Sequence, residues 1–183
     1  MTATATADWN ADDARRGGGK IPLGTRLAAL FAGGKAALRD AGAEPTQGAE
    51  VARAANLAQG VARDLGSPAP EVWTYSGPPN ALGVRVGRPV VALSTDLLAT
   101  FARTEIEAVI AHLVVRMVRA DRSDIIGYAD DVRTVALTRF PPALASALEK
   151  TVPYEGRFAH HYFAAVAPSH RPLAERIAAL QDI

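Results

Sequence analysis

The segment Thr104–Ala120, with the sequence TEIEAVIAHLVVRMVRA, constrains the fold of this chain more than any other stretch. Its apolar side chains recur at the three- and four-residue spacing of one helix face, at Ile106, Ile110, Leu113 and Met117. Thr104 followed three residues later by Glu107 is the pattern of a capping box, which would mark the start of the helix. We therefore expect a central helix against which the rest of the domain packs.

The flanking sequence predicts one helix well before this segment, strands directly before it, and further helices after it. We expect helices at 48–65 (capped by Thr46), 132–138, 143–151 and 173–180, a short helix capped by Thr95 or Asp96, and strands at 71–75, 81–86 and 89–94. The last two strands should form a hairpin around Gly87-Arg88. Because helices and strands are segregated along the chain, the expected class is α+β, with a small antiparallel sheet or hairpin packed against the central helix.

A length of 183 residues suits one domain. Residues 1–20 contain few apolar side chains, which predicts a disordered tail before a single domain at 21–183. Within that domain, 48–183 should form the core, and 21–41 an amphipathic helical segment weakened at Gly33-Gly34. The amphipathic segment either lies on a membrane surface or a partner, or packs on its own domain, and we favour the second interpretation.

The composition narrows the functional classes. A net charge of +1 gives no overall field that would attract nucleic acid. The absence of Cys excludes disulfides and thiolate metal sites. With no apolar run long enough to cross a bilayer and no signal-peptide pattern, the expected location is the cytoplasm. The richness in Ala and Arg is typical of bacterial-type genomic bias.

One histidine on the central helix has an informative context. Many zinc enzymes carry the pattern HExxH on a helix, because histidines four residues apart project to the same side and both reach one ion, while the Glu acts as general base. Here His112 begins the sequence HLVVR, so Leu113 takes the place of the Glu and Arg116 that of the second His. Leu113 cannot accept a proton, and Arg116 has no lone pair to offer a metal.

Further stretches share one order with a known family: Asn80-Ala81, PVVALSTDLL from Pro89, the His112 helix, the acidic pair Asp130-Asp131, LTRFPPAL at 137–144, SALEK at 146–150 and SHRPLAERIAAL at 169–180. In this order they resemble the HtpX-like zinc metallopeptidases, the group that includes the CAAX prenyl endopeptidases. The resemblance runs from about Gly48 to the C-terminus and implies a zincin-like (gluzincin) fold, in a degenerate member without the transmembrane helices of full-length active relatives.

The resemblance also implies the positions of the lost site. In the family, two histidines and a downstream Glu bind zinc, and the Glu lies four residues before a characteristic Asp. If that Asp is Asp131, the ligand position is Gly127, and if it is Asp130, the position is Ile126. Only His112 of the three ligands remains in either register. We expect Arg116 to occupy the place of the metal and to pair with Asp131, which would lie in the second shell, or with a neighbouring carboxylate. The alternative is a surface arginine whose charge reaches solvent.

Other positions follow from the same resemblance. Asn80 would precede the strand along which peptide substrates lie, and we expect the strand 90–94 to provide that exposed edge. The histidines at positions 160, 161 and 170 would line the cleft or serve a rebuilt metal site. Arg176 belongs to the C-terminal motif and should tie the last helix to the core.

Three functions follow. The first is a catalytically inactive peptidase-like protein that binds a peptide or protein partner or acts as a regulatory module, without a cofactor. The second is an active zinc metalloendopeptidase whose metal site is rebuilt from His112 and the C-terminal histidines. The third is a membrane-surface protein acting through residues 21–41.

Overall fold

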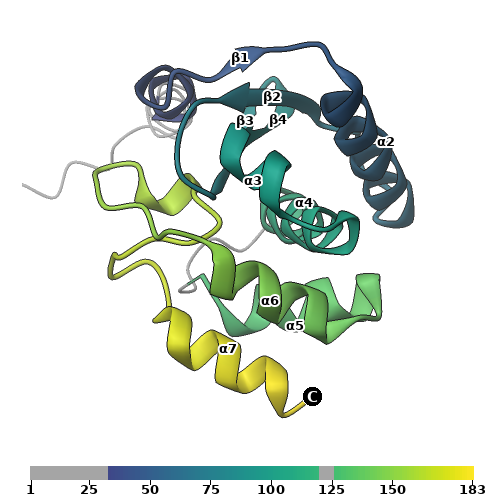
Figure 1. Ribbon diagram of the computed structural model, residues 1–183, viewed down its shortest axis with the longest axis vertical. Helices are drawn as coiled ribbons and strands as arrows, with labels where there is room; N and C mark the ends of the chain where they lie inside the picture. The colour runs from purple at the N-terminus through teal and green to yellow at the C-terminus, as the bar shows by residue number, and fades with distance from the viewer. Residues whose placement is uncertain (1–32, 120–125) are drawn as a thin grey trace, which may run out of the picture.

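The computed structural model describes residues 33–119 and 126–183 of the chain. The expected tail at 1–20 and residues 21–32 of the amphipathic segment lie outside these ranges. Residues 33–40 are helical, and the elements that follow are β1 (Glu44–Pro45), α2 (Ala49–Asp64), β2 (Glu71–Tyr75), β3 (Ala81–Val86), β4 (Arg88–Ser94), α3 (Thr95–Thr100), α4 (Arg103–Val118), α5 (Tyr128–Thr138), α6 (Pro141–Lys150), a 3-10 turn (Ala159–His161) and α7 (Leu173–Gln181) (Figure 1). The class is α+β, as expected from the segregation of the elements.

The sheet is mixed, and this corrects the expected antiparallel sheet. Its strand order is β1-β2-β4-β3, with β2 parallel to β4 from Glu71↔Val90 to Tyr75↔Ser94. The predicted hairpin is present: β3 and β4 pair antiparallel around Gly87, whose φ of 82° suits glycine. Because β4 lies between β2 and β3, the expectation that 90–94 forms the exposed edge is wrong, and β3 is the edge strand on that side.

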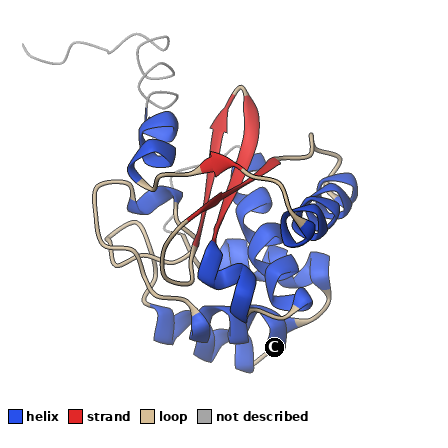
Figure 2. Cartoon of the chain, turned by 45° about the horizontal axis from the view of Figure 1, so that its top comes forward, coloured by secondary structure: helices blue, strands red, loops and turns tan. Residues whose placement is uncertain are grey.

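Alternate residues of β4 belong to two separate hydrophobic cores, one on each face of the sheet. Val91 and Leu93 pack with the α4 side of the molecule, whereas Val90 and Ala92 pack on the opposite face. On that opposite face, Leu38 from the helical residues 33–40 contributes to the core, so this part of the amphipathic segment packs on its own domain. Figure 2 shows the strands between these helical layers.

Helix α4 is the central element, as the sequence predicted, and α5, α6 and α7 lie beyond it from the sheet (Figure 1). Its start differs from the expectation. The helix begins at Arg103, and Glu105 accepts a hydrogen bond from the Ala102 amide at 2.7 Å, so the predicted box of Thr104 and Glu107 is not formed. Glu105 also binds Lys150 Nζ at 2.8 Å, which joins the start of α4 to the end of α6.

Four other predicted caps or helix starts differ from the structure. Ser94 caps α3 through its hydroxyl, which accepts from the Leu97 amide at 3.1 Å, in place of Thr95 or Asp96. Thr46 does not cap α2, because its hydroxyl pairs with that of Thr74 at 2.6 Å. Helix α5 starts at Tyr128, four residues before the expected start, and α6 starts at Pro141, since proline is tolerated in the first helical turn.

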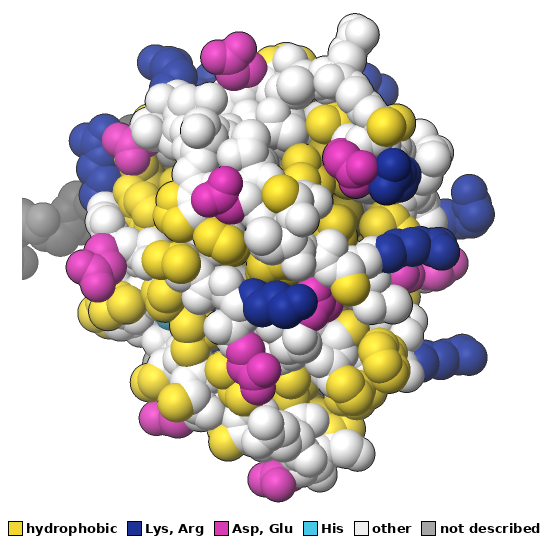
Figure 3. All heavy atoms as spheres, in the orientation of Figure 1, with side chains coloured by type: hydrophobic (Ala, Val, Ile, Leu, Met, Phe, Trp, Pro, Cys, Tyr) yellow, Lys and Arg dark blue, Asp and Glu magenta, His cyan; other side chains and the backbone are white. Residues whose placement is uncertain are grey.

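Within the described ranges, no helix combines the length and the apolarity needed to cross a bilayer. On the face drawn in Figure 3, acidic and basic side chains are interspersed among apolar ones, so the charge is dispersed over that face.

Candidate functional site

His112 lies in the middle of α4 with no exposed surface. Its Nδ1 is 3.2 Å from Asp131 Oδ1, and its ring meets that of Phe163 edge-on at a centroid distance of 5.1 Å. Its Nε2 is buried and has no hydrogen-bond partner among the described residues. Burial lowers the pKa of His112, and although Asp131 acts in the opposite direction, nearby Arg176 acts with burial, so the imidazole is neutral at neutral pH.

Asp131 and Arg176 form the charged centre beside His112. Arg176 donates from Nε to Asp131 Oδ2 at 2.8 Å and from Nη2 to Asp131 Oδ1 at 2.7 Å, a bidentate pair. A third bond runs from Arg176 Nη1 to the carbonyl of Phe163 at 3.0 Å. Burial by itself would raise the pKa of Asp131, but the bonds from Arg176 and the nearby His112 outweigh it and lower the pKa to about 2. Arg176 thus ties α7 to the core, as the sequence motif predicted.

Arg116 does not pair with Asp131, so the expected replacement of the metal by an Arg116–Asp131 ion pair is wrong. The Arg116 guanidinium donates instead to the backbone carbonyl of Tyr162 at 2.7 Å and to that of His160. Burial lowers the pKa of Arg116 to about 10, which leaves it a cation at neutral pH. The carboxylate that would have been its partner is already held on both oxygens by Arg176.

Leu113 occupies the space between α4 and the edge strand. It is only 1% exposed, and a Cβ added at Gly83 of β3 would lie 3.3 Å from Leu113 Cβ and 3.4 Å from Leu113 Cδ2. Contacts this close leave no room for a polypeptide between α4 and β3 at Gly83. Leu113 is therefore part of the hydrophobic core.

The chain's own residues cover the beginning of the β3 edge. Leu82 bridges antiparallel to Tyr162, and the amide of Phe163 donates to the Ala81 carbonyl at 2.8 Å. Arg116 holds the same segment from the side of α4 through the Tyr162 carbonyl. We call residues 159–165 the covering segment. It occupies edge groups that a peptide adding to this strand would need.

Gly127 is the residue before α5, and its carbonyl accepts from the Asp131 amide at 2.9 Å. Asp131 faces His112, whereas Asp130 pairs with Arg119 at 3.0 Å, so Asp131 is the member of the acidic pair that lies beside His112. The φ of Gly127 is 157°, and an added Cβ would lie 2.6 Å from Arg171 Cγ and 2.9 Å from Arg171 Cβ. A residue with a side chain at position 127 would therefore require the Arg171 side chain to move.

Asn80 is a structural residue in this fold. Its side-chain amide donates to the carbonyls of Val152 at 2.7 Å and Ala164 at 2.9 Å, and its Oδ1 accepts from the Ala81 amide at 2.7 Å. With 3% of its surface exposed, it joins the start of β3 to two loop segments.

The three C-terminal histidines make contacts of their own. His170 bonds through Nε2 to the Tyr162 carbonyl at 3.0 Å and through Nδ1 to Ser169 Oγ at 3.2 Å, and burial lowers its pKa to about 4 despite the bond to Tyr162. His160 and His161 lie against each other with a centroid distance of 4.0 Å. Among the residues that the structure describes, no three His, Cys, Asp or Glu side chains gather closely enough to hold a metal ion.

The three positions that the HtpX-like resemblance assigns to zinc ligands do not carry a donor set that fits zinc. Zinc sites in enzymes use three protein ligands, and of the three positions only His112 carries a donor atom, since Arg116 is a cation and Gly127 has no side chain. The sequence did not reveal that the covering segment would bind Arg116. The contacts are made by backbone carbonyls, which carry no sequence pattern.

Comparison with known proteins shows a limited similarity. No family model matches the chain. The chain is 40% identical over 63 residues to a protein described as "Protease HtpX homolog" from Prosthecochloris aestuarii. The matched region takes in 33% of this chain and 22% of that protein, so it spans about a fifth of the relative's length. This similarity supports an HtpX-like relationship for part of the chain.

Proposed function

We propose that this protein is a non-catalytic domain of the zincin type, related to HtpX-like metallopeptidases, that works as a peptide- or protein-binding or regulatory module. Zinc peptidase chemistry needs a held metal and a base that takes a proton from the attacking water. This chain has Leu113 at the base position and Arg116 and Gly127 at two ligand positions. The proposal rests on these replacements and on the way the fold uses them.

The observation that carries the proposal is the position of the Arg116 side chain. Its guanidinium binds the carbonyls of His160 and Tyr162 and so fastens the covering segment next to His112. Leu113 packs under Gly83 from the same helix. Both replacements therefore contribute to packing where an active site would need an open cleft, which is the behaviour expected of a site converted to a structural role.

The same geometry supports a binding surface away from the old cleft. The β3 edge is covered at Ala81 and Leu82 by the chain itself, and Val84 is only 1% exposed. A partner that paired with this strand would first have to displace the covering segment. We therefore propose that a partner is bound by the outer surfaces of the domain.

The alternative is an active zinc metalloendopeptidase of the HtpX-like type with a rebuilt metal site. Two observations favour it: the partial similarity to a protein described as a protease HtpX homolog, and the buried His112 Nε2 without a hydrogen-bond partner among the described residues. In this arrangement His170 would have to leave the Tyr162 carbonyl to reach an ion shared with His112.

Metal analysis combined with a protease assay distinguishes the non-catalytic domain from the active metalloendopeptidase. The full chain is purified, equilibrated with zinc, passed through a desalting column and analysed for bound metal, and then incubated with unfolded casein. The proposal predicts substoichiometric zinc and casein hydrolysis no greater than that of a His112→Ala variant prepared in parallel. Stoichiometric zinc together with hydrolysis that a chelator abolishes and that His112→Ala lacks would overturn the proposal and establish the alternative.

A further inference from the structure

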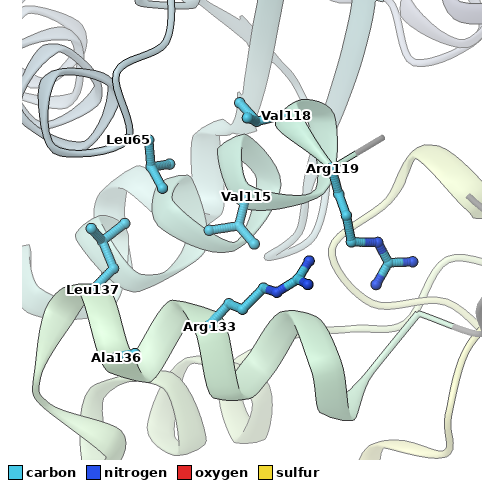
Figure 4. Close-up of a pocket in the computed structure, with 7 residues that line it drawn as sticks. All are labelled: Leu65, Val115, Val118, Arg119, Arg133, Ala136 and Leu137. Atoms are coloured by element: carbon cyan, nitrogen blue, oxygen red, sulfur yellow. The ribbon is translucent and has the colours of Figure 1, made fainter. Parts of the chain in front are cut away.

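A hollow outside the site described above lies between the C-terminal ends of α2 and α4 and the flank of α5 (Figure 4). It encloses about 410 Å³, two arginines form part of its wall, and its apolar lining consists of Leu65, Val115, Val118, Ala136 and Leu137. Val115 is buried, whereas Val118 is 43% exposed. Pockets for small molecules are concave, mostly apolar and roughly 300–1,000 Å³ in volume, so the hollow is large enough for one aromatic side chain.

Trp9 is a feature of the sequence to which the site described above gives no role. Apart from Met1, it is the only large apolar side chain in residues 1–20, a stretch otherwise made of small and polar residues. Aromatic side chains bury about 150–250 Å² each, and tryptophan is enriched among the residues that anchor one surface on another. A single tryptophan in such a polar stretch is therefore a candidate anchor for docking.

The other large apolar residues before the described range fit a different surface. Leu27, Leu30 and Phe31 continue, at helical spacing, the stripe that contains Ala37 and Leu38. Ala37 and Leu38 are buried in the core on the face of the sheet opposite α4. The hollow is lined by residues of the α4 side. By this spacing we expect 27–31 to pack on the opposite face, so they do not compete with Trp9 for the hollow.

The chain that joins Trp9 to the described range is long enough to reach the hollow. That range begins at Gly33, where an added Cβ would lie 3.9 Å from His161 Nε2. At about 3.3–3.6 Å per extended residue, the stretch from Trp9 to Gly33 spans up to about 80 Å, or about 60 Å if residues 21–32 form a helix. A domain of this size has a radius of gyration of roughly 15 Å, so either length extends halfway around it.

We propose that the hollow is the docking site for Trp9 of the same chain. The indole would lie against Val115 and Leu137, cover the exposed Val118, and so fasten the N-terminal residues to the α4–α5 side of the domain. The occupant is the chain's own tryptophan and not that of a second copy, because a tether gives a segment an effective concentration of order mM. At that concentration even a weak contact by one side chain is populated without a partner molecule.

The test is amide and indole NMR of the full chain. Trp9→Ser should shift amides at Leu65, in 115–118 and in 136–137 and leave those of the sheet in place, because only the hollow loses an aromatic ring. The Trp9 indole N–H signal is identified by its loss in this variant. Ala136→Gln places a longer polar side chain in the hollow and should move that signal to its position in the urea-unfolded chain. Ala129→Gln, at another exposed alanine of α5 outside the lining, is the matched control and should not move it.

Dilution distinguishes docking within one chain from docking between two copies. Docking within the chain predicts that the Trp9 indole signal stays in place over about a tenfold dilution. The proposal is overturned if Trp9→Ser shifts no amide at the hollow, or if its shifts are spread over the whole domain. It is equally overturned if Ala136→Gln and Ala129→Gln affect the indole signal alike, or if the signal moves on dilution, which would place Trp9 in a second copy.

Discussion

Arg176 holds Asp131 through two parallel hydrogen bonds of 2.8 and 2.7 Å, and both side chains are almost completely buried. This pair joins α7 to α5 directly beside His112, whose Nδ1 lies 3.2 Å from the same Asp131 oxygen that Arg176 Nη2 contacts. The geometry keeps the aspartate ionised, because the guanidinium supplies the compensating charge.

Replacing Arg176 with Met should lower the free energy of unfolding by about 3–5 kcal/mol, because it leaves a buried carboxylate without its partner. Arg53→Met is the control, since Arg53 pairs with Glu50 on the surface with 69% and 51% of the side chains exposed. That variant should change stability by less than about 1 kcal/mol. Urea unfolding measures the stability of both variants. Equal losses of stability in Arg176→Met and Arg53→Met would contradict a structural role for the buried pair.

His170 should make the fold sensitive to mild acid. Burial lowers its pKa to about 4 in the folded chain from its ordinary value of 6.5, so the folded state favours the neutral ring. Its contribution to stability is therefore complete above about pH 6.5 and is lost as the pH falls toward 4, by roughly 3 kcal/mol in total. His170→Gln retains an N–H donor for the Tyr162 carbonyl but does not titrate, and urea unfolding across this range should show a shallower loss than in the wild type. Parallel curves for the two proteins would refute the assignment.

Arg116→Met should loosen the covering segment. The substitution removes the bonds to the carbonyls of His160 and Tyr162, and bonds from a charged donor contribute about 1.5–3 kcal/mol each. We expect hydrogen exchange at the Phe163 amide, which donates to Ala81, to accelerate at least about tenfold, while amides of β4 keep their protection. In Arg116→Lys, exchange at the Phe163 amide should be faster than in the wild type and slower than in Arg116→Met, because one ammonium cannot reproduce the fork of guanidinium donors. Unchanged exchange at Phe163 in Arg116→Met would show that Arg116 does not fasten the segment.

Gly83 and Leu113 should be energetically coupled. Gly83→Ala places a methyl group 3.3 Å from Leu113 Cβ and 3.4 Å from its Cδ2, which should cost about 1–3 kcal/mol of stability. Leu113→Ala alone should cost about 2–5 kcal/mol as a core truncation. In the double variant the shortened side chain at position 113 should relieve part of the destabilisation caused by Gly83→Ala. A double-mutant cycle by urea unfolding should therefore give a coupling free energy of about 0.5–3 kcal/mol. Strict additivity would mean that Leu113 does not pack against the edge strand.

Restoring the zinc ligands should require a fourth change. We expect the triple variant Leu113→Glu/Arg116→His/Gly127→Glu to bind zinc only partially, because a side chain at 127 meets Arg171 at 2.6 Å with a φ of 157°. Adding Arg171→Gly removes the atoms that obstruct it and should raise zinc occupancy, measured by metal analysis after desalting. The control is the double variant Leu113→Glu/Arg116→His, which keeps Gly127. If its zinc affinity equals that of the quadruple variant with Glu at position 127 and Gly at position 171, position 127 is not the place of the third zinc ligand.

The sequence by itself determined the class of the fold and the position of its central helix. The three- and four-residue spacing of apolar side chains in α4 and the β-hairpin around Gly87 are local patterns, and local patterns are set by neighbouring residues. The sequence also determined which residues stand at the positions that the HtpX-like resemblance assigns to the zinc site, because Leu113, Arg116 and Gly127 are identities and not contacts.

Only the tertiary structure decided what the replacing residues do. The sequence suggested that Arg116 would pair with Asp131, but Arg176 from α7, far away in the sequence, already saturates that carboxylate. Arg116 then binds backbone carbonyls of the covering segment. Because every residue has a backbone carbonyl, no sequence pattern could have predicted these contacts. The parallel pairing of β2 with β4 was equally hidden, because strand neighbours are chosen by packing of the whole sheet against α4 and not by the strands' own residues.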